Sequence, residues 1–266
     1  ERMLEQEAAY APLEALARQA NVQDFDAEYA RSLEDPDAFW GAWAERYVWT
    51  TPWQRVSVID FPHHRWFVGG ETNITENALG RHAERQGDKA ALIAVREDGS
   101  SRTVSYRDLR DQVARFAGAL RGLGVGKGDT AIIYMPLTLE GIGAMLACAR
   151  LGAILSVVYA GMGVGALTDR IRDIGAKVVI AGDVSMRRGQ AVDLTRIVDD
   201  ALAQVEVEHV VWFRRASRTS PPCPSTPSTR SSCSTPRGRP ASRRASCTFT
   251  AGTWWGRPTT CARSST

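Results

Sequence analysis

Residues 130–158, TAIIYMPLTLEGIGAMLACARLGAILSVV, decide the fold class of this chain of 266 residues. Two short apolar runs, 130–135 and 154–159, flank a segment of helical length that is rich in small residues, 140–150. Pro136 ends the first run, because proline cannot donate a hydrogen bond within a sheet. A strand, a helix and a second strand of these lengths predict a βαβ unit with parallel strands.

The same alternation continues on both sides of this unit. Ser105 is predicted to cap the first long helix, with Asp108 placed to answer its backbone amide. The whole pattern predicts an α/β fold with a doubly wound, mostly parallel sheet. Ligands bind such sheets beyond the carboxyl ends of the strands, so we expect the informative loops to follow Tyr134, Val158 and Ala181. The further predicted strands are 90–96, 102–104, 177–181 and 209–213, and the further helices are 105–120, 165–174 and 193–204.

Aromatic residues mark the N-terminal part of the chain. Such residues could form a ligand surface, but we expect them to pack an irregular N-terminal segment onto a domain. The predicted organisation is therefore a helical and aromatic wrap over 1–85, a partial α/β domain over 86–215 and a tail over 216–266. The aromatic residues are Phe39, Trp40, Trp43, Tyr47, Trp49, Trp53, Phe61, Trp66 and Phe67.

The tail, 216–266, differs sharply in composition from the rest. It contains no Val, Ile, Leu or Met and no Asp, Glu or Lys, but it holds eight Arg. Such a composition cannot form an apolar core and predicts a disordered segment. The first 215 residues carry 25 basic and 30 acidic side chains. Because the basic excess lies in the tail, we do not expect a folded nucleic-acid-binding surface.

Cysteine usage indicates a reducing compartment. Cys148 lies in an apolar helical pattern and is expected to be a small core residue, whereas the other four cysteines are all in the tail. The chain has no CxxC pair or Cys/His cluster, so neither zinc nor a disulfide framework is predicted. There is no signal peptide and no apolar run long enough to span a bilayer, and we expect a cytoplasmic protein without a membrane partner.

Three strings in order resemble the adenylate-forming acyl-CoA synthetases, in particular the acetyl-CoA synthetase branch. The first is RWFVGGETN at 65–73. The second is SYRDL at 105–109, with GKGD at 126–129 and YMP at 134–136. The third starts with AMLACAR at 144–150 and continues through SVVY at 156–159 and DRI at 169–171 to RRG at 187–189. The resemblance covers roughly residues 35–213 and does not extend into the tail.

This resemblance implies the N-terminal part of the adenylate-forming fold and a ligase reaction in two steps. ATP and a carboxylic acid, by default acetate, form an acyl-adenylate and pyrophosphate, and coenzyme A then gives acyl-CoA and AMP. The family uses Mg²⁺ and a phosphate-gripping loop that resembles YTSGTTGKPKG, which is absent from this sequence. We therefore expect the chain by itself to lack ligase activity.

The resemblance also implies a coenzyme A site. Arg187 matches a family arginine near the nucleotide phosphates, and Arg188, Gly189 and Gln190 complete that segment, although the family often has a basic residue in place of Gln190. The alternative interpretation is a solvated basic turn before a helix. No catalytic residue and no metal ligand is predicted.

The segment Tyr159, Ala160 and Gly161 matches an aromatic-Gly-Gly loop near the pantetheine tunnel of the family, with Ala160 replacing a glycine. The alternative is a simple turn between a strand and a helix. Glycines at 161, 163 and 165 also partly resemble a dinucleotide fingerprint, with Asp183 near the place of a ribose-binding acid. The synthetase strings account for the same residues better, so a dehydrogenase is not favoured.

Codons give the tail a second interpretation. Consider a frame that takes the last base of each codon and the first two bases of the next, with Ser242 and Arg244 given AG-type codons. In that frame 235–245 are compatible with YTSGTTGKPKG, 246–253 with VVHVHGGY and 228–234 with EDPLFVL. Each step admits roughly four residue types, so this run of agreements is specific. We interpret the tail as the missing loop read out of frame, after a frameshift between Arg214 and Pro222.

A second hypothesis treats the chain as a non-catalytic coenzyme A- or nucleotide-binding fragment, or an interaction fragment, with a basic disordered arm. Mass spectrometry of the native protein separates the two hypotheses. A peptide from the Ser/Thr/Pro/Arg tail supports the second, and a peptide that covers the in-frame loop supports the first.

Overall fold

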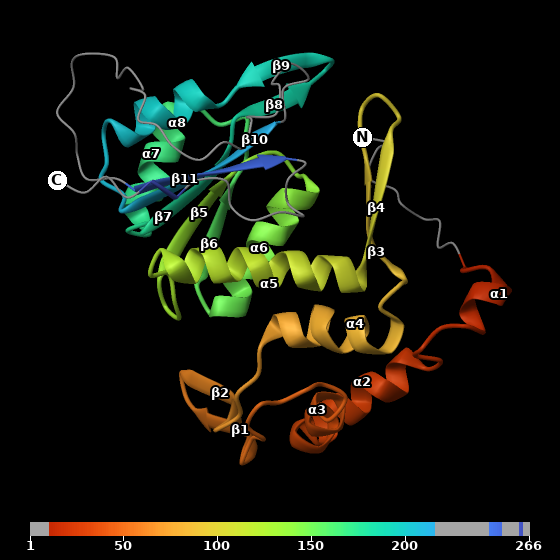
Figure 1. Ribbon diagram of the computed structural model, residues 1–266. Helices are drawn as coiled ribbons and strands as arrows, with labels where there is room; N and C mark the ends of the chain where they lie inside the picture. The colour runs from red at the N-terminus through yellow and green to blue at the C-terminus, as the bar shows by residue number, and fades with distance from the viewer. Residues whose placement is uncertain (1–10, 216–244, 252–260, 263–266) are drawn as a thin grey trace, which may run out of the picture. The chain divides into compact units, whose positions relative to one another are not determined.

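The computed structural model describes residues 11–215, 245–251 and 261–262 (Figure 1). The chain divides into two compact units, 1–72 and 73–266. Among the described residues, no helix is both long and apolar enough to cross a membrane.

The described part of the first unit, 11–72, contains three helices and one hairpin. Asp24 and Asp35 cap the second and third helices, because their side chains accept hydrogen bonds of 2.9 Å from the amides of Ala27 and Ala38. The rings of Trp49, Trp53 and Phe67 pack together with centroid separations of 4.9 to 5.5 Å. The elements are α1 (Glu14–Ala17), α2 (Phe25–Glu34), α3 (Pro36–Ala44) and the antiparallel pair β1 (Arg55–Asp60) and β2 (His63–Val68).

The second unit is built around one sheet whose strand order is β12-β11-β10-β7-β5-β6. All strands from β11 to β6 are parallel, and β12 alone runs antiparallel. The predicted fold class, an α/β fold with a mostly parallel doubly wound sheet, is confirmed. The strands are β5 (Thr130–Tyr134), β6 (Ile154–Val158), β7 (Val178–Gly182), β10 (His209–Arg215), β11 (Ala245–Ala251) and β12 (Cys261–Ala262).

Helices cover both faces of this sheet (Figure 1). Alternate residues of each buried strand point to opposite faces, so Ile133 and Ile180 pack on one side and Ile132 and Val179 on the other. The helices of the first face are α5 (Tyr106–Gly122) and α6 (Leu139–Leu151), and those of the second are α7 (Val164–Asp173) and α8 (Thr195–Leu202). A π-helical turn at Glu76–Gly80 and α4 (Arg81–Gln86) precede this core.

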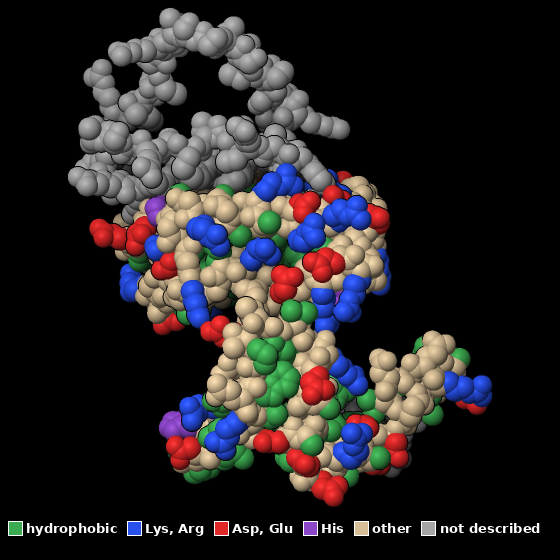
Figure 2. All heavy atoms as spheres, turned by 60° about the horizontal axis from the view of Figure 1, so that its bottom comes forward, with side chains coloured by type: hydrophobic (Ala, Val, Ile, Leu, Met, Phe, Trp, Pro, Cys, Tyr) green, Lys and Arg blue, Asp and Glu red, His purple; other side chains and the backbone are tan. Residues whose placement is uncertain are grey.

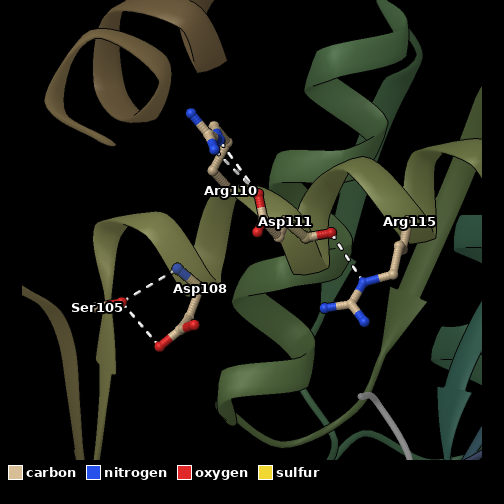
Figure 3. A network of polar contacts seen from close by, with 5 residues as sticks. All are labelled: Ser105, Asp108, Arg110, Asp111 and Arg115. Atoms are coloured by element: carbon tan, nitrogen blue, oxygen red, sulfur yellow. Dashed lines mark hydrogen bonds and ion pairs between the residues drawn. The ribbon is translucent and has the colours of Figure 1, made fainter. Parts of the chain in front are cut away.

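The longest helix, α5, begins at the predicted cap (Figure 3). The Ser105 hydroxyl oxygen accepts a hydrogen bond of 3.1 Å from the amide of Asp108 and donates one of 2.8 Å to the Asp108 carboxylate. One turn later, Arg110 contacts the Asp111 carboxylate at 3.3 Å, and Arg115 donates to the Asp111 carbonyl oxygen at 3.1 Å. The cap and the first turns of the helix are thus stabilised locally.

Two hairpins lie beside the sheet. The first pairs β3 (Ala90–Val95) with β4 (Ser101–Ser105), which match the predicted strands 90–96 and 102–104. The second pairs β8 (Val184–Arg187) with β9 (Gln190–Asp193), and neither of these strands was predicted. The helix predicted for 193–204 accordingly starts later, at Thr195, because the residues before it form the second hairpin.

The prediction of a disordered tail is wrong for 245–251. These residues form β11, which pairs in parallel with β10 along its whole length. The segment includes Thr248, Phe249 and Thr250, residue types that favour strands, and β10 would otherwise present an unpaired edge. The parts of the tail at 216–244, 252–260 and 263–266 lie outside the described residues, and so does the prediction of disorder for them.

Charges of both signs are interspersed on the face shown in Figure 2, where Lys and Arg side chains lie next to Asp and Glu side chains. The second unit contains pairs of this kind, such as Lys177 with Asp129 at 2.9 Å and Arg172 with Asp169 at 3.4 Å. The described residues on this face therefore do not gather into one large basic field.

Candidate functional site

The candidate site lies at the carboxyl ends of β5, β6 and β7, the edge at which the predicted loops meet. The end of β7 and the segment after β5 are in direct contact, since a Cβ added to Gly182 would lie 3.3 Å from the Cβ of Met135. Two cavities open along this edge, one of about 560 Å³ and one of about 680 Å³. We call the first the loop cavity and the second the hairpin cavity.

The loop cavity joins the segment after β6 to the unpredicted hairpin. Three of its lining residues are the predicted site residues Tyr159, Ala160 and Gly161. Apolar groups dominate its wall, which suits a thin, largely apolar ligand chain. The opposing lining residues are Met135, Pro136 and Leu137 after β5, and Ser185, Met186 and Val192 from β8 and β9.

The segment after β6 is compact. Ala160 is buried, whereas the ring of Tyr159 is 64% exposed and lies over Gly161. A Cβ at Gly161 would lie 2.5 Å from Cε1 of that ring, a distance that forces the ring to move. Glycine at this position therefore lets the Tyr159 ring lie close to the backbone.

A buried hydroxyl holds this segment in place. The Tyr134 hydroxyl at the end of β5 donates a hydrogen bond of 2.6 Å to the carbonyl oxygen of Met162. The Tyr134 side chain is fully buried, and burial raises the pKa of its phenol, so the group stays a donor at neutral pH. The amide of Met162 in turn donates to the Tyr159 carbonyl oxygen at 3.0 Å.

The predicted phosphate-binding segment forms the tip of the β8–β9 hairpin. Arg187 pairs with Gln190, and the two residues between them, Arg188 and Gly189, have φ angles of 51° and 74°. Two successive positive φ angles are typical of tight hairpin turns. The side chain of Arg187 lies outside the described part of the structure, and the Arg188 side chain is exposed.

The base of this hairpin is tied to the sheet. The Asp183 amide donates to the Phe213 carbonyl oxygen at 3.2 Å, and the Leu194 amide donates to the Asp183 carbonyl oxygen at 2.9 Å. Asp193 accepts hydrogen bonds from the hydroxyl and the amide of Thr195, which lower the pKa of its carboxyl group. The first turn of α8 thus begins directly at the end of the hairpin.

The hairpin cavity lies between the two hairpin tips and the sheet edge. Its lining includes Arg96, Glu97 and Asp98 from the turn between β3 and β4, together with Gly189 from the β8–β9 tip. Glu97 also accepts hydrogen bonds from the backbone of the β8–β9 turn. The predicted site residues are therefore divided, since Tyr159, Ala160 and Gly161 line one cavity and Gly189 lines the other.

The sequence pattern did not point to several residues of this site. Met186 lines both cavities, and Ser185 and Val192 line the loop cavity. The sequence does not reveal them because their strands have only four residues each. Glu97 follows the predicted strand 90–96, and its contact joins residues that are 91 and 92 positions apart. The only local signal was the Arg-Arg-Gly string at 187–189.

The part of the chain that the structure describes contains no group of three or more His, Cys, Asp or Glu side chains arranged to hold a metal ion.

Comparisons with known proteins cover both units. The family model "AMP-binding enzyme" matches residues 79–254, and the model "Acetyl-coenzyme A synthetase N-terminus" matches residues 25–78. The acetyl-coenzyme A synthetase of Thiobacillus denitrificans is 44% identical over 224 residues, which cover 81% of this chain and 34% of that protein. The 3-hydroxypropionyl-coenzyme A synthetase of Metallosphaera sedula is 47% identical over 190 residues, or 69% of this chain and 29% of that protein.

Among solved structures, the acetoacetyl-CoA synthetase from Streptomyces lividans is similar, with a TM-score of 0.69 and 28% sequence identity. The match covers 75% of this chain and 32% of that structure. The chain thus spans about a third of the length of the curated relatives that it matches.

Proposed function

This chain belongs to the AMP-binding enzyme family, and we propose that it supplies part of the coenzyme A site of a short-chain acyl-CoA ligase. The acetyl-coenzyme A synthetase N-terminus match at 25–78 supports this branch of the family, and acetate is the proposed acid. The proposed partners are small molecules, namely the acid, ATP and coenzyme A. The proposed location is the cytoplasm.

The proposed reaction has two steps. A carboxylate oxygen attacks the α-phosphorus of ATP, which forms an acyl-adenylate and releases pyrophosphate. The thiol of coenzyme A then attacks the acyl carbon, loses its proton and displaces AMP, which leaves the thioester. The described residues enter this scheme only by binding and orienting coenzyme A.

One observation carries the proposal, namely that three of the seven residues predicted from sequence to bind coenzyme A line one cavity at the carboxyl edge of the sheet. Tyr159, Ala160 and Gly161 face Ser185 and Met186 across the loop cavity. Parallel sheets bind ligands at this edge, and the apolar wall suits the pantetheine arm.

The tip of the β8–β9 hairpin is the proposed phosphate contact. Arg188 is exposed at the turn, and its guanidinium group can donate two parallel hydrogen bonds to a phosphate. Arg187 is proposed to act in the same way, on the strength of its match to the family motif. Gln190 carries no charge, so it contributes at most a neutral hydrogen bond.

Calorimetric titration of the chain of 266 residues with coenzyme A tests the proposal. We expect binding, weaker binding of dephospho-coenzyme A, and a loss of about tenfold in affinity in Arg188→Ala. Arg121→Ala is the matched control, because Arg121 lies in the last turn of α5 and lines neither cavity. Equal affinities of the two Arg variants would contradict a phosphate contact at the hairpin tip.

A separate proposal concerns the tail, 216–266. We infer that the gene segment encoding 216–266 specifies the phosphate-gripping loop in another frame, and that the chain as translated therefore forms no acyl-CoA. Sequencing of the locus tests the first statement, since stop codons or the absence of YTSGTTGKPKG in the shifted frame would contradict it. Formation of AMP and acetyl-CoA by the purified chain would contradict the second.

A further inference from the structure

The turn between β3 and β4 contacts the turn between β8 and β9 through a single carboxylate. Oε1 of Glu97 lies 3.3 Å from the amide nitrogen of Arg188, and Oε2 lies 3.0 Å from the amide nitrogen of Gly189. Each oxygen therefore accepts one backbone hydrogen bond. The contact joins segments that are more than 90 positions apart in sequence.

These two amides lie in an exposed turn and can bind an acceptor outside the hairpin. In a two-residue hairpin turn the ladder ends at the flanking residues, here Arg187 and Gln190. The N–H groups of the two central residues, Arg188 and Gly189, are left without an acceptor in the ladder. A carboxylate that takes both gives charge-assisted hydrogen bonds, which are stronger than bonds to a neutral acceptor.

The turn that carries Glu97 is itself held by hydrogen bonds. The Asp98 carboxylate accepts from the amide and the hydroxyl of Ser100 at 2.9 and 2.6 Å, and these bonds lower the pKa of the Asp98 carboxyl group. The Arg96 amide donates to the Ser100 carbonyl oxygen at 2.9 Å, and the Gly99 amide donates to the Arg96 carbonyl oxygen at 3.0 Å. Glu97 thus projects from a fixed turn rather than from a loose loop.

The conformation of the β8–β9 tip also calls for an external restraint. Arg188 is a non-glycine residue with a φ of 51°, a region that side chains other than Gly, Asn and Asp rarely occupy. Such a conformation persists where surrounding contacts hold it. The Glu97 carboxylate is bonded to this residue and to the next, so it supplies such a contact.

We propose that Glu97 is a positioning residue that fixes the β8–β9 tip and thereby orients the Arg188 guanidinium group toward the coenzyme A phosphates. This inference rests on the proposed coenzyme A site. The carboxylate occupies the amide side of the turn, so the phosphate approaches from the guanidinium side. Glu97 does not touch the ligand and acts through Arg188.

The test compares Glu97→Ala and Glu97→Gln with the matched control Asp98→Asn in the chain of 266 residues. Asp98 is the next residue, and asparagine keeps the Oδ1 that accepts both hydrogen bonds from Ser100. The replacement therefore removes the same charge but leaves the turn and the Glu97 contact in place. The first readout is backbone hydrogen exchange of Arg188 and Gly189. The second is calorimetric affinity for coenzyme A, with exchange in β7 as the check that each variant is folded.

We expect exchange of the two turn amides to accelerate about tenfold in Glu97→Ala, by a smaller factor in Glu97→Gln and hardly at all in Asp98→Asn. We expect the dissociation constant for coenzyme A to rise in the same order, by about five- to tenfold in Glu97→Ala. Unchanged exchange in both Glu97 variants overturns the proposal. Tighter binding of coenzyme A in Glu97→Ala also overturns it, because the carboxylate would then compete with phosphate.

The two readouts separate this inference from the function on which it rests. If the wild-type chain does not bind coenzyme A but the turn amides still lose protection in Glu97→Ala, Glu97 fixes the hairpin and the proposed coenzyme A site is wrong. If coenzyme A binds and the Glu97 variants match wild type in both readouts, the site stands and the role of Glu97 is wrong.

Discussion

The Tyr134 hydroxyl oxygen lies 2.6 Å from the carbonyl oxygen of Met162, and this hydrogen bond ties the end of β5 to the segment that follows β6. Both residues belong to the carboxyl edge of the sheet, and Met162 lines the loop cavity. A buried side chain of the central sheet thus helps to position the segment that lines the loop cavity.

Replacement of this hydroxyl tests the link. Tyr134→Phe keeps the ring but removes the donor, so the Met162 carbonyl loses its partner at a cost of about 1 kcal/mol in unfolding free energy. We also expect weaker binding of coenzyme A, since the segment from Tyr159 to Met162 becomes less ordered. Urea unfolding and calorimetry measure the two effects.

Tyr106→Phe is a suitable control, because Tyr106 lies on α5 and lines neither cavity. The hydrogen bond is not important for the site if both variants bind coenzyme A as tightly as the wild type.

The close contact between Gly161 and Tyr159 gives a second prediction. In Gly161→Ala the new Cβ would lie 2.5 Å from Cε1 of the Tyr159 ring, so the ring must swing away from the backbone. Because the ring is mostly exposed, we expect little change in stability but a clear drop in affinity for coenzyme A. Gly165→Ala is the matched control, since a Cβ there meets no atom within 4 Å and Gly165 lines neither cavity. Equal affinities of the two variants would count against Tyr159 as part of the site.

The sequence predicts the fold best in residues 130–158. Strand, helix and strand appear there with bounds close to those predicted, because each element carries enough apolar residues to display its period. The Ser105 cap of α5 was equally predictable, since its hydroxyl accepts from the Asp108 amide within one turn. The Asp108 carboxylate, however, accepts from the Ser105 hydroxyl and not, as predicted, from the Ser105 amide. Local chemistry fixes both features.

The β8–β9 hairpin was not predicted, because its local sequence carries too weak a signal. Its strands have four residues each, too few to display an alternating pattern, and its turn places Arg188 rather than glycine at the first positive φ. The contact with Glu97 depends on the folded chain and leaves no local signal. The family motif indicated that the Arg-Arg-Gly string matters, but it did not predict that the string forms a hairpin tip.

The ion pair at the amino end of β5 predicts a dependence of stability on pH. Asp129 accepts a hydrogen bond of 2.9 Å from Lys177 and one of 2.8 Å from the Gly126 amide, and these contacts lower the pKa of its carboxyl group. A carboxyl group with a lowered pKa in the folded state stabilises the fold above its unfolded-state pKa, about 4. That contribution is lost as the pH falls through the folded-state pKa.

We therefore expect wild type to be more stable than Asp129→Asn between about pH 6 and pH 8, and the difference to shrink below about pH 4. Urea unfolding at a series of pH values measures the difference. In the background of Lys177→Met the Asp129 substitution should cost less, because the largest contact is already gone. A difference that stays constant down to pH 2 would show that the Asp129 carboxyl group titrates alike in both states.

The thiol of Cys148 reports whether the second unit folds in the chain as given. Cys148 is fully buried on α6, and burial raises the pKa of the thiol to about 12. Only the thiolate reacts with alkylating agents, so at pH 8 the folded chain should label at Cys148 about a thousandfold more slowly than an ordinary cysteine. Mass spectrometry of the peptide that contains Cys148 measures the rate, with urea-unfolded chain as the control. In the described fold Cys148 is fully buried, so the reagent cannot reach it. If native protein labels as fast as the unfolded control, the core between α5, α6 and the sheet does not form.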